Sequence, residues 1–542
     1  MAAMQDEMKR SMAELRMKGE AAPYYIAYEV LDRSMSDISG RLGAIVESPL
    51  RRTRTLRVEV RVGDYTFDSS RFVVQGFGGG AGMSGETVLA PLDDDYDAMR
   101  REIWLTTDTA YKRAITLFAR KKAVFQNRTA SDPIPDFSQE PPAETIVPGV
   151  HLKPDVAGGG IGSVRFEAHR ADLLARVRQS SAVFAAHPDI DLSETAIAQV
   201  HGTRYYLNSE GFKTVAPIHI TSLMMYGEAH ASDGMPVRQT FSEVGRTIAD
   251  LPSAADLAAS AKRIAEEVDA ARVAPIGEEF AGPVLIEGLA GPQFVSETLV
   301  QMMQARRPPD AENPRMAQAS PSPFLNRTGL RVIADAFNAS DTPSLTHFEG
   351  KPLAGSYAVD DEGVRARDVA LVSKGRLATL LTSRVPQKNF GRSNGHGRSN
   401  TVLAGVFQLE SAQAIPASEL KDKYTALLKA QDKTYGYIVR GVRSDGQGGA
   451  GPGIDSIVKV TLDGRETPVR GMRFGTVSPM AFRDLAEASI ERAVFSYRAG
   501  ATSAVSVIAP SLIFEELEIQ RIRDILQKPP VVPSPLKTLN VH

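Results

Sequence analysis

The segment Gly282–Gln304 reads GPVLIEGLAGPQFVSETLVQMMQ and combines a short apolar strand with a helix. The stretch from Pro283 to Glu287 has three apolar residues in a row, which is typical of a buried strand. Gly288 and Gly291 mark a turn, and a helix is predicted from about residue 293. The apolar positions of this helix suit a buried face: Phe294, Leu299, Val300, Met302 and Met303. The segment therefore predicts a strand and a helix that enter the same core.

The polar residues of this helix raise the question of a metal site. A helical zinc peptidase requires two histidines and a glutamate on one helix face, because imidazole nitrogens bind the zinc and the carboxylate acts as general base. Between Ser296 and Gln301 this chain supplies only Glu297. Serine and glutamine are poor zinc ligands compared with histidine. The sequence therefore predicts no metal site and no confident catalytic residue at this position.

Composition excludes several classes of protein. The chain has 542 residues with 63 basic and 65 acidic side chains, a net charge of -2 that offers no electrostatic footprint for direct binding of nucleic acid. It contains no cysteine, which excludes disulfides, thiolate metal sites and a cysteine nucleophile. No stretch of about 20 apolar residues predicts a membrane span. The start, MAAMQDEMKRSM, lacks a signal-peptide run, so we expect a soluble protein that is cytoplasmic, or exported if a signal peptide was removed earlier.

The chain divides into two parts that differ in predicted secondary structure, and together they predict an α+β protein. Residues 1–275 combine long helical patterns, at 93–127 and 253–273, with strands of an antiparallel sheet. Within them, Leu56, Val58, Val60 and Val62 alternate with Arg57, Glu59 and Arg61, the period of a half-buried antiparallel strand. The proline-rich stretch 132–154 predicts an extended linker or surface strap. Residues 276–528 contain short strands separated by glycines and predict a β-rich domain, and residues 529–542 form a proline-rich tail.

A polar, glycine-rich loop is the second candidate site. Residues 389–400 read NFGRSNGHGRSN, and Arg392, Asn394, His396 and Arg398 supply hydrogen-bond donors. Such a loop suits contact with a peptide carboxylate, an anion or a partner surface, and it equally suits a plain surface loop. Both interpretations remain open from the sequence.

Several segments, in order and spacing, resemble the TldD/PmbA family, also called gyrase modulators. The resemblance begins at about Tyr24 and is strongest from Leu192 to Met480. The segments are Tyr206–Gly211, Gly282–Gln301, Ser322–Leu325, Gly355–Tyr357, Asp360–Gly363, Gly375–Leu377, Gly391–Arg398 and Val469–Phe474. Each segment is weak alone, and their common order carries the resemblance.

The resemblance implies an N-terminal α/β domain followed by a barrel-like C-terminal domain, and a paired assembly. In this family one subunit type is a zinc peptidase with an HExxxH helix and a later cysteine ligand, and the other type lacks these ligands. The pair cleaves peptides or unfolded chains that enter in extended form. The HExxxH positions match Ser296, Glu297 and Gln301 here, and the cysteine has no counterpart. The resemblance therefore implies the type without zinc, with zinc only in the partner.

Three functions follow as expectations. The first is a non-catalytic subunit that assembles with an HExxxH-containing TldD-like homologue, as a homo- or hetero-dimer, and helps to bind extended peptides. The second is a stand-alone, homo-oligomeric peptide-binding protein. The third is an active metallopeptidase or other hydrolase with a different site, which would draw on His347, His396, Glu297 or Glu362.

Overall fold

The computed structural model describes residues 1–74, 85–126, 134–146, 163–313, 321–444 and 452–523, with residues 530, 532 and 534–539. Residues 132, 133 and 147–154 of the proline-rich stretch, and residues 529, 531, 533 and 540–542 of the predicted tail, lie outside this described part. The fold is α+β, as predicted. No helix in the described ranges is long and apolar enough to cross a membrane.

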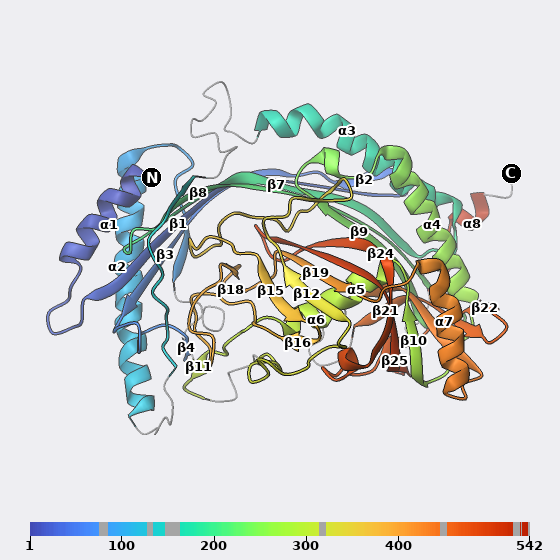
Figure 1. The fold of residues 1–542 in the computed structure, drawn as a ribbon. Helices are drawn as coiled ribbons and strands as arrows, with labels where there is room; N and C mark the ends of the chain where they lie inside the picture. The colour runs from blue at the N-terminus through green and yellow to red at the C-terminus, as the bar shows by residue number, and fades with distance from the viewer. Residues whose placement is uncertain are drawn as a thin grey trace.

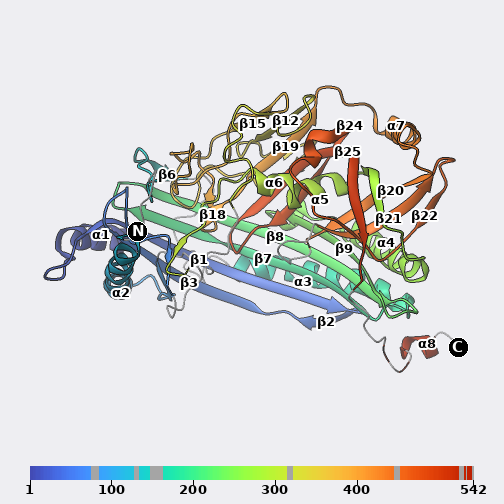
Figure 2. The same ribbon diagram turned by 90° about the horizontal axis from the view of Figure 1, so that it is seen from below.

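Long strands form the first sheet, in the order β5-β3-β1-β7-β8-β6, with β2 paired to β1 and β9 to β8. Except for the parallel pair β6–β8, the pairings are antiparallel. The strands are β1 (Pro23–Arg41), β2 (Ala44–Glu47), β3 (Leu50–Val62), β5 (Glu86–Leu89), β6 (Glu144–Ile146), β7 (Leu192–Asn208), β8 (Lys213–His230) and β9 (Pro236–Gly245). In Figure 1 this sheet arches over the C-terminal half of the chain, and Figure 2 shows its strands from below.

Four helices cover the outer face of this sheet (Figure 1). They are α1 (Ala2–Glu14), α2 (Tyr96–Phe125), α3 (Ser163–Ala182) and α4 (Ala254–Val273). The side chain of Asp95 caps α2 by accepting from the Ala98 N–H at 2.7 Å, and Ser253 caps α4 by accepting from the Asp256 N–H at 3.2 Å. These caps satisfy backbone donors that a helix start leaves unpaired. The two helices predicted from the sequence are therefore confirmed, with ends shifted by a few residues.

The alternating pattern of β3 separates two environments. Leu56, Val58 and Val60 pack in one cluster with apolar residues of α2, including Ile103 and Ala114. The alternate residues Arg57, Glu59 and Arg61 belong to the opposite face, and they line a cavity beneath the sheet together with residues from the C-terminal part. The polar face predicted from the sequence therefore meets the rest of the protein rather than open water.

The C-terminal part contains a closed barrel of five strands. β10 (Phe280–Ile286), β20 (Tyr435–Arg443), β21 (Gly453–Thr461), β23 (Met472–Phe474) and β25 (Ala504–Arg521) follow one another in the ring. The ring closes because β10 pairs with both β20 and β25. The barrel expected from the resemblance is therefore present.

From β25 the same sheet continues outward through four more strands, β19 (Val406–Ser411), β12 (Phe337–Asp341), β15 (Val369–Ser373) and β16 (Arg376–Leu377). β22 (Glu466–Pro468) pairs with β21, and β24 (Leu485–Arg498) pairs with β25. Three short pairs complete the strands: β4 (Phe72–Val73) with β11 (Asp310–Ala311), β13 (His347–Phe348) with β14 (Lys351–Pro352), and β17 (Gly397–Arg398) with β18 (Thr401–Val402). The helix α7 (Ala417–Ala430) lies beside the barrel, and α8 (Leu536–Leu539) is a short turn near the C-terminus (Figure 1).

The described part of the proline-rich stretch, residues 134–146, contains both buried and exposed positions: residues 136–138 and 140 are buried, and residues 135, 139, 141, 142 and 144 are exposed. Phe137 is 3% exposed, and Asp136, Ser138 and Glu140 are also buried. The backbone N–H of Phe137 donates to the Tyr65 carbonyl at 3.1 Å, and that of Ser138 donates to the Arg384 carbonyl at 2.9 Å. The segment therefore lies between the sheet and the C-terminal part. The predicted boundaries after residues 275 and 528 stay predictions.

Candidate functional site

The opening strand and helix of the C-terminal part lie in its core. β10 is followed by α5 (Ala290–Glu297) and α6 (Leu299–Met302), and the two helices are separated at Thr298, where φ is -122° and ψ is -85°. Phe294 packs against three aromatic rings, those of Phe474, Phe482 and Phe514. At Gly291 a Cβ atom would collide with the Pro510 carbonyl of β25, so this position requires glycine for the helix to approach the barrel wall. The predicted strand and buried helix are confirmed.

The side chains at the HExxxH-like positions are already engaged within the protein. Ser296 is fully buried, and its hydroxyl donates to the Gln293 carbonyl at 2.7 Å. The Gln301 amide donates through Nε2 to the Ser296 carbonyl at 3.1 Å, while its Oε1 accepts from Nη2 of Arg306 at 3.1 Å. A guanidinium therefore lies at the residue that matches the second histidine. A cation beside Gln301 opposes the binding of another cation there.

These residues do not fit a zinc ion. Zinc sites in proteins use imidazole, thiolate or carboxylate ligands, typically three or four of them. At these positions Glu297 is the one such group, because Ser296 and Gln301 offer a hydroxyl and an amide. Elsewhere in the described ranges, no group of three or more histidine and acidic side chains is placed to hold a metal ion. The donor set thus differs from that of the zinc-binding subunit type.

Glu297 lies near Tyr497 and Arg306. The Glu297 side chain is half-buried. Burial of the Tyr497 hydroxyl is the main cause that raises the pKa of Tyr497, and the negative charge of Glu297 is the next. The charge of Arg306 acts in the opposite direction on the same hydroxyl. Glu297, Tyr497 and Arg306 are therefore close enough to interact electrostatically. The position that matches the motif glutamate therefore holds a half-buried carboxylate beside a tyrosine and an arginine.

The loop 389–400 is mostly a packed element rather than an open surface. His396 is fully buried: its Nε2 lies 3.2 Å from Oδ1 of Asp341, and its Nδ1 lies 2.9 Å from Oδ1 of Asn394. Arg398 is 5% exposed and donates to the carbonyls of Ala404 and Ala504 at 2.9 Å each. Arg392 is exposed. A contact of these four residues with a peptide or partner stays a prediction, and Arg392 is the member that the surface presents directly.

The acidic turn 360–363 packs directly against this loop. Oδ2 of Asp360 accepts from the Gly397 N–H at 3.0 Å, and Oε2 of Glu362 accepts from the Arg384 N–H at 2.7 Å. Burial, and then the charge of Glu362, raise the pKa of Asp360 to about 8. His347 is exposed on β13, whereas His396 is fully buried, and a hydrolase site that uses either of them stays a prediction.

A cavity of about 250 Å³ lies between the N-terminal sheet and the C-terminal part. Its walls come from β1, β3 and β7 on one side and from the segments around residues 306, 361, 383 and 400 on the other. The rings of Tyr25, Phe137 and Tyr206 contribute apolar surface, and arginines and carboxylates contribute charge. Arg306 also lines this cavity, which connects it to the residues that match the zinc motif.

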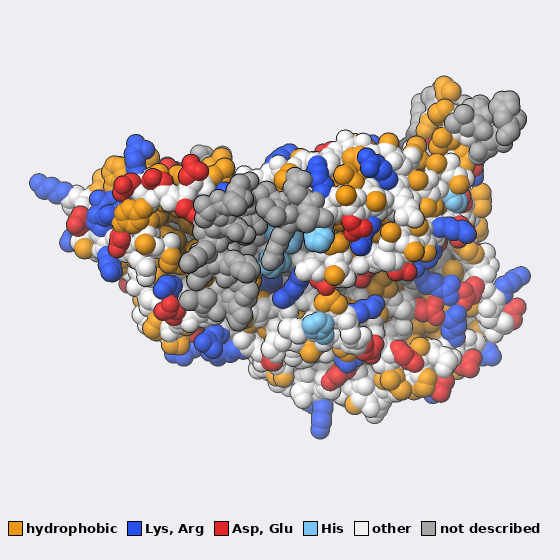
Figure 3. All heavy atoms as spheres, turned by 90° about the horizontal axis from the view of Figure 1, so that it is seen from above, with side chains coloured by type: hydrophobic (Ala, Val, Ile, Leu, Met, Phe, Trp, Pro, Cys, Tyr) orange, Lys and Arg blue, Asp and Glu red, His pale blue; other side chains and the backbone are white. Residues whose placement is uncertain are grey.

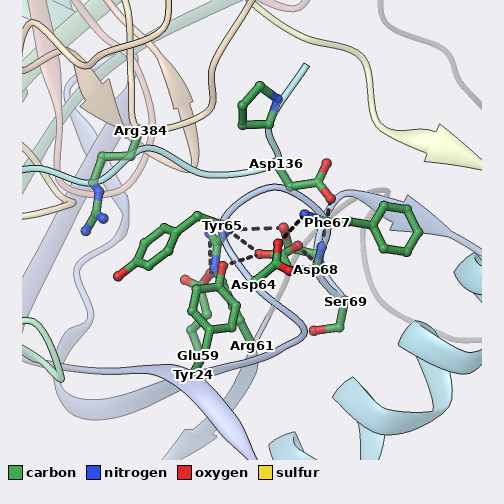
Figure 4. Close-up of polar contacts among 12 residues, drawn as sticks. Tyr24, Glu59, Arg61, Asp64, Tyr65, Phe67, Asp68, Ser69, Asp136 and Arg384 are labelled. Atoms are coloured by element: carbon green, nitrogen blue, oxygen red, sulfur yellow. Dashed lines mark hydrogen bonds and ion pairs between the residues drawn. The ribbon is translucent and has the colours of Figure 1, made fainter. Parts of the chain in front are cut away.

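A buried ionic cluster forms one wall of the cavity (Figure 4). Arg61 lies 2.6 Å from Glu59 and 3.1 Å from Asp68, and the Tyr24 hydroxyl donates to Asp68 at 2.7 Å. The guanidinium carbon of Arg61 lies 3.6 Å from the centre of the Phe137 ring, and that of Arg384 lies 3.9 Å from it. Sequence reasoning found the alternation of Arg57, Glu59 and Arg61 but missed Phe137 and Arg384, for which no local pattern exists.

The face of the molecule seen from above (Figure 3) shows no large area of one charge sign among its described residues. On the face seen in Figure 3, the described basic and acidic side chains are interspersed rather than gathered into one large area of a single sign. The prediction that the protein does not bind nucleic acid directly remains a prediction.

Comparisons with known proteins agree with this geometry. Residues 281–521 match the family model for the PmbA/TldA metallopeptidase C-terminal domain. A comparison with curated protein sequences found no match.

Solved structures share the fold at low sequence identity. A putative modulator of a DNA gyrase from Thermotoga maritima is 14% identical with a TM-score of 0.59, and the alignment covers 95% of this chain and 100% of that chain. TldE from Thermococcus kodakarensis is 14% identical with a TM-score of 0.56, covering 95% and 99% of the two chains. A putative modulator of DNA gyrase from Bacteroides thetaiotaomicron is 12% identical with a TM-score of 0.55, covering 95% and 98%. At these identities the structures show a common fold.

Proposed function

Because the chain belongs to the TldD/PmbA family of peptidase-related proteins, we propose that it is a non-catalytic subunit that assembles with a zinc-peptidase homologue. In this role it helps to bind extended peptide substrates, and the zinc belongs to the partner. The two subunits together form the active peptidase, as a heterodimer or a larger assembly.

The observation that supports this proposal most directly concerns the two residues that match the HExxxH histidines. Ser296 and Gln301 hydrogen-bond within the protein, and Gln301 accepts from a guanidinium. Glu297 without a metal has no activated water to deprotonate. The interior cavity supports the second half of the proposal, because it combines aromatic rings with charged side chains that suit a peptide in extended form.

The test is co-expression of the tagged chain with an HExxxH-containing homologue from the same genome. We expect the two to co-purify, and we expect chelator-sensitive cleavage of an unfolded peptide only when the homologue is present. A chain that elutes alone contradicts the proposal. If it then forms a homo-oligomer that binds peptides without cleaving them, the stand-alone binding protein replaces the subunit. Stoichiometric zinc in the chain alone, with chelator-sensitive cleavage, indicates an active peptidase instead.

A further inference from the structure

Two arginines from distant parts of the chain line the same cavity. Arg71 lies just before β4, and Arg306 follows α6. The parallel pairing of β4 with β11 brings the two segments together, because the Asp310 N–H donates to the Arg71 carbonyl at 2.8 Å. The guanidinium of Arg71 also donates to the Arg307 carbonyl. The position of both arginines is therefore set by backbone contacts.

The charge of these two arginines is not neutralised by an ion pair. The other three arginines of the lining pair with carboxylates: Arg57 with Glu59 at 3.8 Å, Arg61 with Glu59 at 2.6 Å, and Arg307 with Asp136 at 3.2 Å. Among the described residues, no carboxylate forms an ion pair with Arg71 or Arg306. The Nε atom of each is buried and has no hydrogen-bond partner there either. A buried donor of this kind is costly unless a ligand or water satisfies it.

Burial lowers the pKa of both arginines, because it disfavours the charged form of a guanidinium. Burial, with the nearby charge of Arg307, lowers the pKa of Arg71 to about 10, and burial lowers the pKa of Arg306. At neutral pH the Arg71 guanidinium still carries its positive charge. The charges of Asp136 and Asp310 act in the opposite direction on Arg71 without forming an ion pair with it. The cavity thus contains two cations that the fold has partly removed from water and that form no ion pair with a carboxylate of the described residues.

Among the described residues of the same lining, no carboxyl group forms an ion pair with either arginine. Asp361 pairs with Arg204, and Glu59 pairs with Arg61. Glu29, on β1, forms no ion pair with Arg71 or Arg306. Burial raises the pKa of Glu362, which favours its neutral form.

We propose that Arg71 and Arg306 bind a carboxylate of an extended peptide in this cavity. The inference rests on the proposed function, since it names the group of the peptide that the chain recognises. The carboxylate is either the C-terminus of the peptide or an acidic side chain, and the chemistry is the same for both. A guanidinium presents two parallel N–H donors to a carboxylate, so arginine suits this role better than lysine. Tyr25, Phe137 and Tyr206 supply apolar contacts to the rest of the peptide end.

The test uses the full chain and three acetylated tripeptides in isothermal titration calorimetry. The peptides are acetyl-Ala-Ala-Ala as the free acid, the same peptide as the amide, and acetyl-Ala-Glu-Ala as the amide. We expect at least one carboxylate-bearing peptide to bind about tenfold or more tightly than the neutral amide. Preference for the free acid identifies the C-terminus, and preference for the glutamate peptide identifies an acidic side chain.

Variants assign the effect to the two arginines. Arg71→Met and Arg306→Met should each reduce binding of the carboxylate peptide to the level of the neutral amide. Arg71→Lys should retain part of it, because the charge remains while the paired donors are lost. Arg376→Gln is the matched control: Arg376 is exposed and donates to the Gly329 carbonyl outside the cavity, so its loss should leave binding unchanged. Circular dichroism verifies that each variant is folded.

The proposal is overturned if the three peptides bind the unmodified chain equally, if none of them binds, or if both methionine variants bind the carboxylate peptide as the unmodified chain does. Each of these outcomes leaves the proposed function open, because co-purification with the homologue decides that function independently. If the chain does not co-purify with the homologue but still binds the carboxylate peptide, the arginine site is supported on a protein that acts alone.

Discussion

The guanidinium of Arg384 donates to both carboxylate oxygens of Glu210, at 2.5 and 2.7 Å, and so joins the C-terminal part of the chain to the hairpin between β7 and β8. Arg384 is fully buried and also donates to the Ser138 carbonyl of the proline-rich stretch at 2.5 and 3.2 Å. Three segments distant in sequence therefore meet at one side chain. The relative position of sheet, stretch and C-terminal part depends on it.

We predict that Arg384→Met lowers the free energy of unfolding by about 3–5 kcal/mol, because it leaves the mostly buried Glu210 carboxylate without its cationic partner. Urea unfolding monitored by fluorescence gives the change. Lys262→Ala is the control, since its pair with Glu266 is exposed and such pairs contribute about 0–1 kcal/mol. Equal stability of the two variants would contradict a structural role for the Arg384–Glu210 pair.

Phe137→Ala should destabilise the protein by about 3–5 kcal/mol, the range for removing a buried phenylalanine side chain. The ring lies between the guanidinium groups of Arg61 and Arg384, so the substitution removes two cation–π contacts together with apolar burial. Differential scanning calorimetry measures the loss, and limited proteolysis reports whether residues 134–146 have become accessible. Were this stretch only a surface linker, the melting temperature would stay unchanged.

Asp68→Asn should reduce stability in a pH-dependent way. Burial by itself would raise the pKa of Asp68, but the charge of Arg61 and hydrogen bonds from the Ser70 side chain and the Tyr24 hydroxyl outweigh it and hold that pKa below its ordinary value. The carboxylate therefore stabilises the fold above its unfolded pKa of 3.8, and this contribution is lost as the pH falls through the lowered folded value.

The measurement for Asp68 is the free energy of unfolding at a series of pH values. The gap between the unmodified chain and Asp68→Asn should stay constant from about pH 8 to 5 and close below about pH 4. Asp422→Asn, an exposed substitution on α7, serves as control. A gap that persists unchanged at the lowest pH at which the protein still folds would show that the ionised Asp68 is not the source.

Ser296→His should lower the free energy of unfolding by about 1–3 kcal/mol, because a larger ring must enter a fully packed position. Ser296→Ala, which removes only the hydrogen bond to the Gln293 carbonyl, should cost about 0.5–1.5 kcal/mol. We further expect the double variant Ser296→His, Gln301→His to purify without zinc, as measured by elemental analysis. Arg306 lies beside residue 301 and disfavours a second cation there. Stoichiometric zinc in the double variant would show that the helix retains a usable metal geometry.

Several features of the fold could be predicted because they depend on neighbours in sequence. The alternation in β3 gave the correct division between an apolar and a charged face, since successive side chains of a strand point to opposite sides. The helical patterns at 93–127 and 253–273 gave α2 and α4, because the spacing of apolar residues along a helix is a local property of the sequence. In the proline-rich stretch, composition did not show that Phe137 packs between the sheet and the C-terminal part, because composition does not record what packs over a segment.

The sequence by itself determined the buried strand and helix at Gly282–Gln304, the absence of cysteine, and the replacement of the motif histidines by Ser296 and Gln301. These follow from residue identity and from short-range periodicity. Only the tertiary structure decided that Arg306 lies against Gln301, that Arg384 reaches Glu210 across 174 residues, and that Arg71 and Arg306 share one cavity. The physical reason is that ionic contacts of this kind need chain segments brought together by barrel closure and sheet packing, and no local pattern records which distant charges will meet.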